Sequence, residues 1–69
     1  MPLTIVGVGE THTIKRISGS EEQHRHLENL GFVVGAEVTV VAKVDQDVIV
    51  NIKEARVAIG RELAGKIFV

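Results

Sequence analysis

A period of two in the hydrophobic pattern of residues 37–44 predicts a β-strand, because alternate side chains of a strand point to opposite faces. A polar turn at residues 45–47 and an apolar run at residues 48–52 follow, and together these segments predict a hairpin. A second turn, Lys53-Glu54, leads to another predicted strand over residues 56–59. The apolar faces of the first and last of these strands are expected to consist of Val38, Val40, Ala42 and Val44, and of Val57 and Ile59.

The first part of the chain also has an extended character. Its first eight residues are mostly apolar and are interrupted by glycine, which predicts an extended lead-in that ends in a turn. Residues 11–17 have the composition of a strand, but Ile14 and Ile17 are three positions apart rather than two. This spacing predicts a bulge or bend near residues 15–16.

Residues 19–31 form the one predicted helix. The segment Ser20-Glu21-Glu22-Gln23 has the spacing of a capping box, in which the side chains of serine and glutamine satisfy each other's backbone amides. Gly31 is placed to end the helix in a left-handed conformation, and Phe32 would then fold back on Leu27. The helix has a narrow apolar stripe, so we expect it to cover a sheet or the end of a barrel.

These elements predict one mainly β domain that spans residues 1–69. A single helical turn at residues 60–65 and a closing strand over residues 66–69, with Ile67 and Val69 inward, complete the pattern. Five short strands in so small a chain favour a strongly bent barrel, because closure protects the strand edges. A chain of this length has little room for both a core and a deep enclosed site.

Composition excludes several classes of function. The 69 residues carry a net charge of −1 with no block of like charge, and they include no Trp or Tyr. Nucleic-acid binding, which favours a basic groove with stacking aromatic residues, and recognition of proline-rich peptides are therefore not expected. The chain has no Cys, no apolar segment long enough for membrane insertion and no signal-peptide pattern, so we expect a cytoplasmic protein. No residue pattern indicates catalysis, and the protein is not expected to be an enzyme.

Two segments resemble a known family. Residues 25–38, RHLENLGFVVGAEV, resemble the pattern R-x-L-x-x-L-G-(L/F)-x-P-G-x-x-V, and residues 57–69, VAIGRELAGKIFV, resemble V-A-L-R-x-x-x-A-x-x-I-x-V. In this order and spacing, the segments are similar to FeoA, protein A of bacterial ferrous-iron transport. The chain differs from the family at Val8 and Val34, where proline is often found, and in a shorter loop at residues 45–47.

The resemblance implies both a fold and a role. The family fold is an SH3-like barrel of five strands, which agrees with the pattern above. The implied role is to dock on the cytoplasmic GTPase part of a ferrous-iron permease, which would recruit the protein to the inner face of the membrane. A related domain is appended to iron-dependent repressors, so a small metal-binding or metal-sensing domain is the alternative. Self-association is also left open, because small barrels with exposed apolar edges often dimerise.

The helix exit supplies the candidate docking residues. These positions have the composition of a helix cap and core, and any exposed part of them would form an apolar docking surface. The candidates are Leu27, Leu30, Gly31, Phe32 and Gly35.

The helix also supplies the candidate metal ligands, for Fe(II) or another divalent transition metal bound weakly. His24 and His26 are two positions apart, so their side chains diverge on a helix and cannot chelate one ion. Glu22 with His26, and His24 with Glu28, are four apart, and each pair could supply two ligands. A strong site needs three or four ligands, and a solvated helix face explains the same residues.

Overall fold

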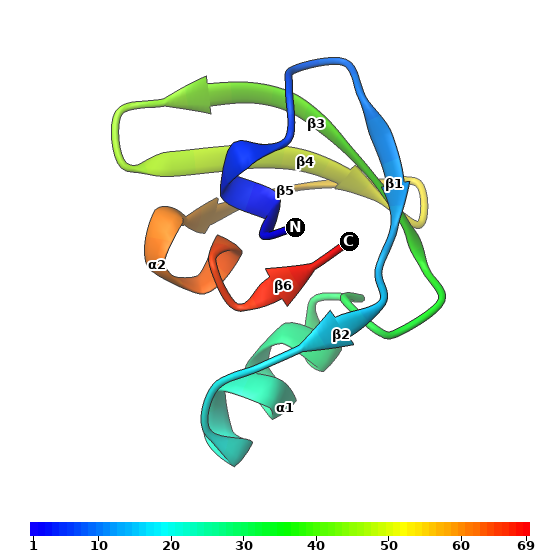
Figure 1. Ribbon diagram of the computed structural model, residues 1–69, viewed down its shortest axis with the longest axis vertical. Coiled ribbons are helices and arrows are strands. Elements are labelled where there is room, and N and C mark those ends of the chain that lie inside the picture. The colour runs from blue at the N-terminus through cyan, green and yellow to red at the C-terminus, as the bar shows by residue number, and fades with distance from the viewer.

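The computed structural model describes all residues, Met1–Val69, and contains two antiparallel sheets (Figure 1). A four-stranded sheet has the order β1-β3-β4-β5, and a two-stranded sheet pairs β2 with β6. The strands are β1 (Thr11–Thr13), β2 (Arg16–Ile17), β3 (Glu37–Val44), β4 (Asp47–Ile52), β5 (Ala55–Gly60) and β6 (Ile67–Phe68). The helices are η1 (Leu3–Ile5), α1 (Glu21–Asn29) and α2 (Arg61–Ala64). The predicted mainly β architecture is confirmed.

The strand predicted over residues 11–17 is divided between the two sheets, which is why the structure has six strands rather than five. β1 pairs with β3, whereas β2 pairs with β6. The division falls at the predicted bend: the amide of Ile14 donates to the carbonyl of Ala36 at 2.9 Å, and the next amide, of Lys15, donates to Phe68 at 2.7 Å. Consecutive amides thus bond to the residue before β3 and to β6, and the chain links the two sheets at this point.

The two hairpins of the large sheet have short loops. β3 and β4 are joined by Asp45 and Gln46, so Asp47 begins the returning strand instead of belonging to the turn. The register of this pair shifts between Val40 and Ala42, which leaves an extra residue in β3. The predicted alternation holds for Val38 and Val40, which are buried, but fails at Val44, which is 50% exposed. The bulge and the position of Val44 beside the loop, beyond the core, explain the difference.

The turn between β4 and β5 has an unusual backbone. Lys53 and Glu54 have φ angles of 48° and 66°, as a two-residue turn of type I′ requires at both central positions. Neither residue is glycine or asparagine, the residues that favour this conformation. The predicted turn is confirmed, although both of its side chains disfavour this backbone conformation.

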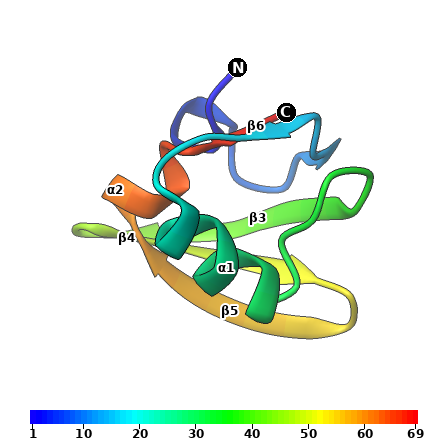
Figure 2. The same cartoon turned by 90° about the horizontal axis from the view of Figure 1, so that it is seen from below.

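The helix begins and ends as the sequence predicts. The Gln23 amide donates to Ser20 Oγ at 3.2 Å and the Ser20 amide donates to Gln23 Oε1 at 3.0 Å, which completes the capping box. At the other end Gly31 has a φ of 103°. The Phe32 amide donates to the Leu27 carbonyl at 2.9 Å, as in a Schellman motif. Figure 2 shows α1 lying across the opening between β5 and the β2–β6 pair.

One apolar core joins all the layers. It consists of fourteen buried residues, none of them polar, and Phe32 is the largest. Its members are Leu3, Val6, Ile14, Leu27, Phe32, Val38, Val40, Val48, Val50, Ile52, Ile59, Ala64, Ile67 and Val69. The inward orientation predicted for Ile59, Ile67 and Val69 is confirmed, while Val57 is half-buried against the core.

The beginning of the chain contributes more to this core than an extended lead-in would. Residues Leu3–Ile5 form a short 3-10 helix, which corrects the predicted extended segment. The turn buries Leu3 completely and brings Val6 to 1% exposure. A fully extended segment would place every second side chain on the same face, whereas this turn lets residues three apart enter the core together.

The backbone at Gly31 gives a stability prediction with an internal control. Gly31→Ala places a side chain at a φ of 103°, and we expect it to lower the free energy of unfolding by about 1–2 kcal/mol. Gly60→Ala is the control, because Gly60 has a φ of −64° and a Cβ there meets nothing within 4 Å. Urea unfolding followed by far-UV circular dichroism measures both. Equal stability of the two variants would contradict the role of Gly31.

Candidate functional site

The structure divides the predicted docking residues into buried and accessible ones. Leu27 and Phe32 have no exposed surface, so their side chains can support a docking surface but cannot contact a partner. Leu30 and Gly31 are half-buried, and Gly35 is exposed. The accessible part of the predicted site is therefore the loop that follows α1, not the apolar face of the helix.

This loop forms one wall of a cleft that the sequence did not reveal. The cleft has a volume of about 320 Å³ and lies between β2, α1 and the loop after α1. Its apolar side is made by Ile17, Val33 and Val34, and Val34 is 63% exposed. The remaining lining residues are Lys15, Arg16, His24 and Glu28. Residues from the first strand segment and from the helix exit meet here only because β2 leaves the large sheet.

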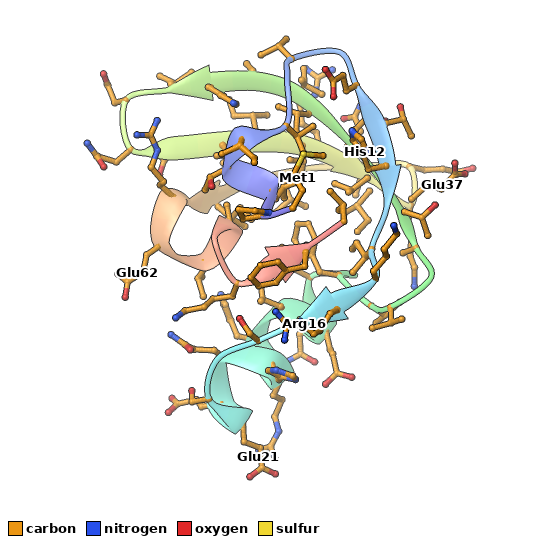
Figure 3. The ribbon with its side chains drawn as sticks, viewed as in Figure 1. Met1, His12, Arg16, Glu21, Glu37 and Glu62 are labelled. Carbon is orange, nitrogen blue, oxygen red and sulfur yellow. The ribbon has the colours of Figure 1, made fainter.

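Arg16 occupies a defined position at the edge of this cleft (Figure 3). Its guanidinium lies 4.4 Å from the centre of the Phe68 ring, a distance typical of a cation–π contact. The one contact within 4 Å between a basic and an acidic side chain joins His12 to Glu10, so no carboxylate lies within 4 Å of the Arg16 guanidinium nitrogens. Stacking on the ring holds the side chain while its N–H groups remain available as donors.

The predicted metal ligands fall on two different surfaces. Glu22 and His26 line an open hollow of about 630 Å³ between α1 and α2, where Glu62 also contributes. His24 and Glu28 line the smaller cleft described above. The structure contains no group of three or more His, Asp or Glu side chains placed to hold one ion. Each predicted pair thus has no third ligand beside it. His24 and His26 line different hollows, as expected of side chains that diverge on a helix.

A polar contact lies at the start of β1, between Glu10, which precedes the strand, and His12, which lies within it. The carboxylate Oε1 of Glu10 lies 3.0 Å from Nε2 of His12. Hydrogen bonding to the His12 side chain is the main cause that lowers the pKa of Glu10 below its ordinary value. Desolvation opposes the shift, while the positive charge of Lys43 nearby adds to it. Neither residue of this pair lines the cleft.

No helix in the structure has both the length and the apolar character needed to cross a lipid bilayer.

The fold and its surface define a small, mainly β domain with an apolar core and an open cleft whose rim carries basic and acidic side chains. The FeoA domain family matches the chain over residues 1–69, and the chain therefore belongs to the FeoA family. A relative from Methanocaldococcus jannaschii, named Fe(2+) transport protein A, is 32% identical over 68 residues, which cover 99% of this chain and 83% of the relative. The family assignment connects the chain with ferrous-iron transport.

Solved structures support the same assignment. An iron uptake regulatory protein, FeoA, has a TM-score of 0.90 at 28% identity, with 97% of this chain and 91% of that chain covered. Stenotrophomonas maltophilia FeoA, described as a procaryotic SH3 domain protein in complex with zinc, has a TM-score of 0.87 at 25% identity, covering 100% and 88% of the two chains. The predicted SH3-like fold is thereby confirmed.

A longer protein contains the same fold as one part of its chain. A manganese-dependent transcriptional repressor has a TM-score of 0.93 at 26% identity, and the match covers 100% of this chain but 40% of the repressor. The predicted likeness to a domain of metal-dependent repressors is thus found in a solved structure.

The contact between Glu10 and His12 gives a prediction on pH. His12→Ala should raise the pKa of Glu10 toward its ordinary value, because the variant loses the hydrogen bond that favours the carboxylate. The contact stabilises the folded state above the ordinary carboxyl pKa, and this contribution is lost as the pH falls through the lowered pKa. Titration of side-chain carboxyl signals by NMR measures the change, with His24→Ala as the control. An unchanged Glu10 titration in His12→Ala would refute this account.

Proposed function

We propose that this protein is a non-enzymatic accessory of ferrous-iron uptake that acts by docking on the cytoplasmic GTPase part of the iron permease. Membership in the FeoA family supports the link to iron transport. The observation that carries the docking step is the cleft between β2 and the helix exit, where an exposed Val34 lies beside Arg16, which has no carboxylate within 4 Å. In this proposal the protein is cytoplasmic and reaches the inner face of the membrane through its partner.

The cleft has the physical properties of a docking surface. An apolar centre with charged groups at its rim is typical of protein interfaces, in which a few residues dominate the free energy of binding. Val34 extends into solvent from a loop whose ends are held by backbone hydrogen bonds, Phe32 to Leu27 and Gly35 to Ile14. A loop fixed in this way loses little conformational entropy when a partner binds.

The charged groups at the rim would fix the orientation of a partner bound at this apolar centre. Arg16 is held against Phe68, and neighbouring Lys15 adds a second cation on the same side of the cleft. Glu28 lies on the α1 side of the cleft, so the rim is positive on one side and negative on the other. A partner with an acidic group beside an apolar one would therefore bind in one orientation.

Val34 offers a direct test of the docking surface. Val34→Asp should weaken binding to the soluble GTPase domain of the permease at least about tenfold, which corresponds to ~1.4 kcal/mol, because it places a charge at the apolar centre. Val44→Asp is the matched control: Val44 is also exposed, at 50%, but lies at the β3–β4 hairpin. Isothermal titration calorimetry measures the affinities, and circular dichroism checks that both variants fold.

Two outcomes would overturn the proposal. One is an absence of binding to both the isolated GTPase domain and the intact permease, with no change in nucleotide hydrolysis. The other is an equal loss of affinity in Val34→Asp and Val44→Asp, which would place the contact elsewhere on the surface.

A second candidate function is that of a small metal-binding or metal-sensing domain. The zinc complex of S. maltophilia FeoA and the likeness to a manganese-dependent repressor favour it. In this chain Glu22, His26 and Glu62 line the same hollow between α1 and α2. Glu62 is not placed as a third ligand beside them, so a metal ion bound there would be held by the Glu22–His26 pair of α1.

Titration with Fe(II), Mn(II) and Zn(II) separates the two functions. If the hollow holds a metal, His26→Ala weakens binding while His24→Ala, in the other cleft, leaves it unchanged. Equal effects of the two substitutions, or binding that neither one changes, would contradict a site in the hollow.

A further inference from the structure

One edge of the large sheet carries none of the usual protections against pairing. β5 is the last strand in the order β1-β3-β4-β5, and in Figure 2 no other element lies beyond it. Its six residues pair with β4 in continuous register without a bulge. The strand contains no proline and a single charged residue, Arg56. Natural sheets commonly protect such an edge with proline, lysine, a bulge or a covering helix.

The register shows which backbone groups face outward at this edge. The two-residue turn makes Ile52 and Ala55 a hydrogen-bonded pair, and bonded pairs alternate along an antiparallel ladder. Val57 and Ile59 therefore bond to β4. The backbone N–H and C=O groups of Arg56 and Ala58 point away from the sheet. The N–H of Gly60 does so as well, whereas its C=O begins α2 as the N-cap.

From this geometry we infer that the protein forms a two-fold symmetric dimer in which β5 pairs with β5 of a second copy, antiparallel and centred on Ala58. In this register Ala58 lies opposite its own copy, and Arg56 lies opposite Gly60. The central Ala58 pair exchanges two hydrogen bonds, and in each flanking pair the Gly60 N–H donates to the Arg56 C=O.

The residues of β5 suit a second copy of the same strand. Pairing about Ala58 places the one charge of the strand opposite glycine, so like charges do not meet across the interface. The side chains at the centre are small, and a Cβ at Gly60 would meet nothing within 4 Å, so there is space for the Arg56 side chain of the second copy. On the inner face Val57 lies opposite Ile59, a β-branched pair that favours strand association. A closed two-fold contact of this kind stops at the dimer.

Paired cysteine variants test both the pairing and its register. The chain has no native cysteine. In Ala58→Cys the two copies of the new residue lie about 5.5 Å apart at Cα, within the ~4.4–6.8 Å range of disulfides. Ala55→Cys is the matched control on the same exposed strand, and the Cα atoms of its two cysteines lie roughly 20 Å apart in the dimer. Oxidation, or a short bifunctional thiol reagent, should link Ala58→Cys into dimers and leave Ala55→Cys monomeric.

Proline at the centre of the strand tests the backbone pairing itself. Ala58→Pro removes an outward N–H and leaves the bonds to β4 in place, so it should fold but sediment as a monomer. Ala58→Thr keeps the N–H and should sediment as the unmodified chain does, with a coefficient that rises from monomer to dimer with concentration. Hydrogen exchange at Ala58 and Gly60 should slow over the same concentration range.

Several results would overturn the inference. Equal crosslinking of Ala58→Cys and Ala55→Cys would do so, as would concentration-dependent sedimentation that Ala58→Pro does not change. A chain that stays monomeric while Ala58→Pro weakens its complex with the GTPase domain would assign β5 to a strand of the partner. The crosslinking and sedimentation experiments use this chain alone, so their outcome is independent of the proposed docking on the permease.

Discussion

The reversal of the chain at Gly31 connects the helix to the β core, and the rest of the structure depends on this connection. α1 contributes only one fully buried side chain, Leu27, so its own apolar stripe is too narrow to anchor it. The hydrogen bond from the Phe32 amide to the Leu27 carbonyl closes the reversal, and Phe32 then enters the core as its largest member. The helix is held over the opening of the sheets because the residue that follows it is buried between them.

The same reversal produces the candidate docking surface. With Phe32 directed inward, the next two residues, Val33 and Val34, are carried outward beside β2. β2 is itself held by its pairing with β6 and by the contact of Arg16 with Phe68. The turn after α1 therefore contributes Phe32 to the core and Val34 to the cleft. Because the buried residue fixes the turn, Val34 is exposed and still held in a defined position.

Local signals were sufficient to predict the helix and most of the strands, but not the 3-10 helix at Leu3–Ile5 or how the elements meet. Ser20, Gln23 and Gly31 act on backbone groups within a few residues, so the helix and its ends could be predicted from the sequence. The bulge in β3, which accompanies the exposure of Val44, depends on pairing with β4 and has no marker in the alternation. The cleft was missed for the same reason, since Arg16 and Val34 become neighbours only through the pairing of β2 with β6. The helix exit is accessible in part, but the pattern could not distinguish its buried residues from its exposed ones.

The turn at Lys53 and Glu54 has a consequence for how the family can vary. Two side-chain-bearing residues with positive φ angles cost on the order of 1–2 kcal/mol each, and the ladders on either side must supply that energy. Asparagine and glycine would adopt this backbone with less strain. Substitutions at these two exposed positions could therefore raise the stability of the fold without altering the core, the cleft or the outer edge of the sheet. The domain is therefore robust to mutation, because a loss of stability elsewhere could be offset at this exposed turn.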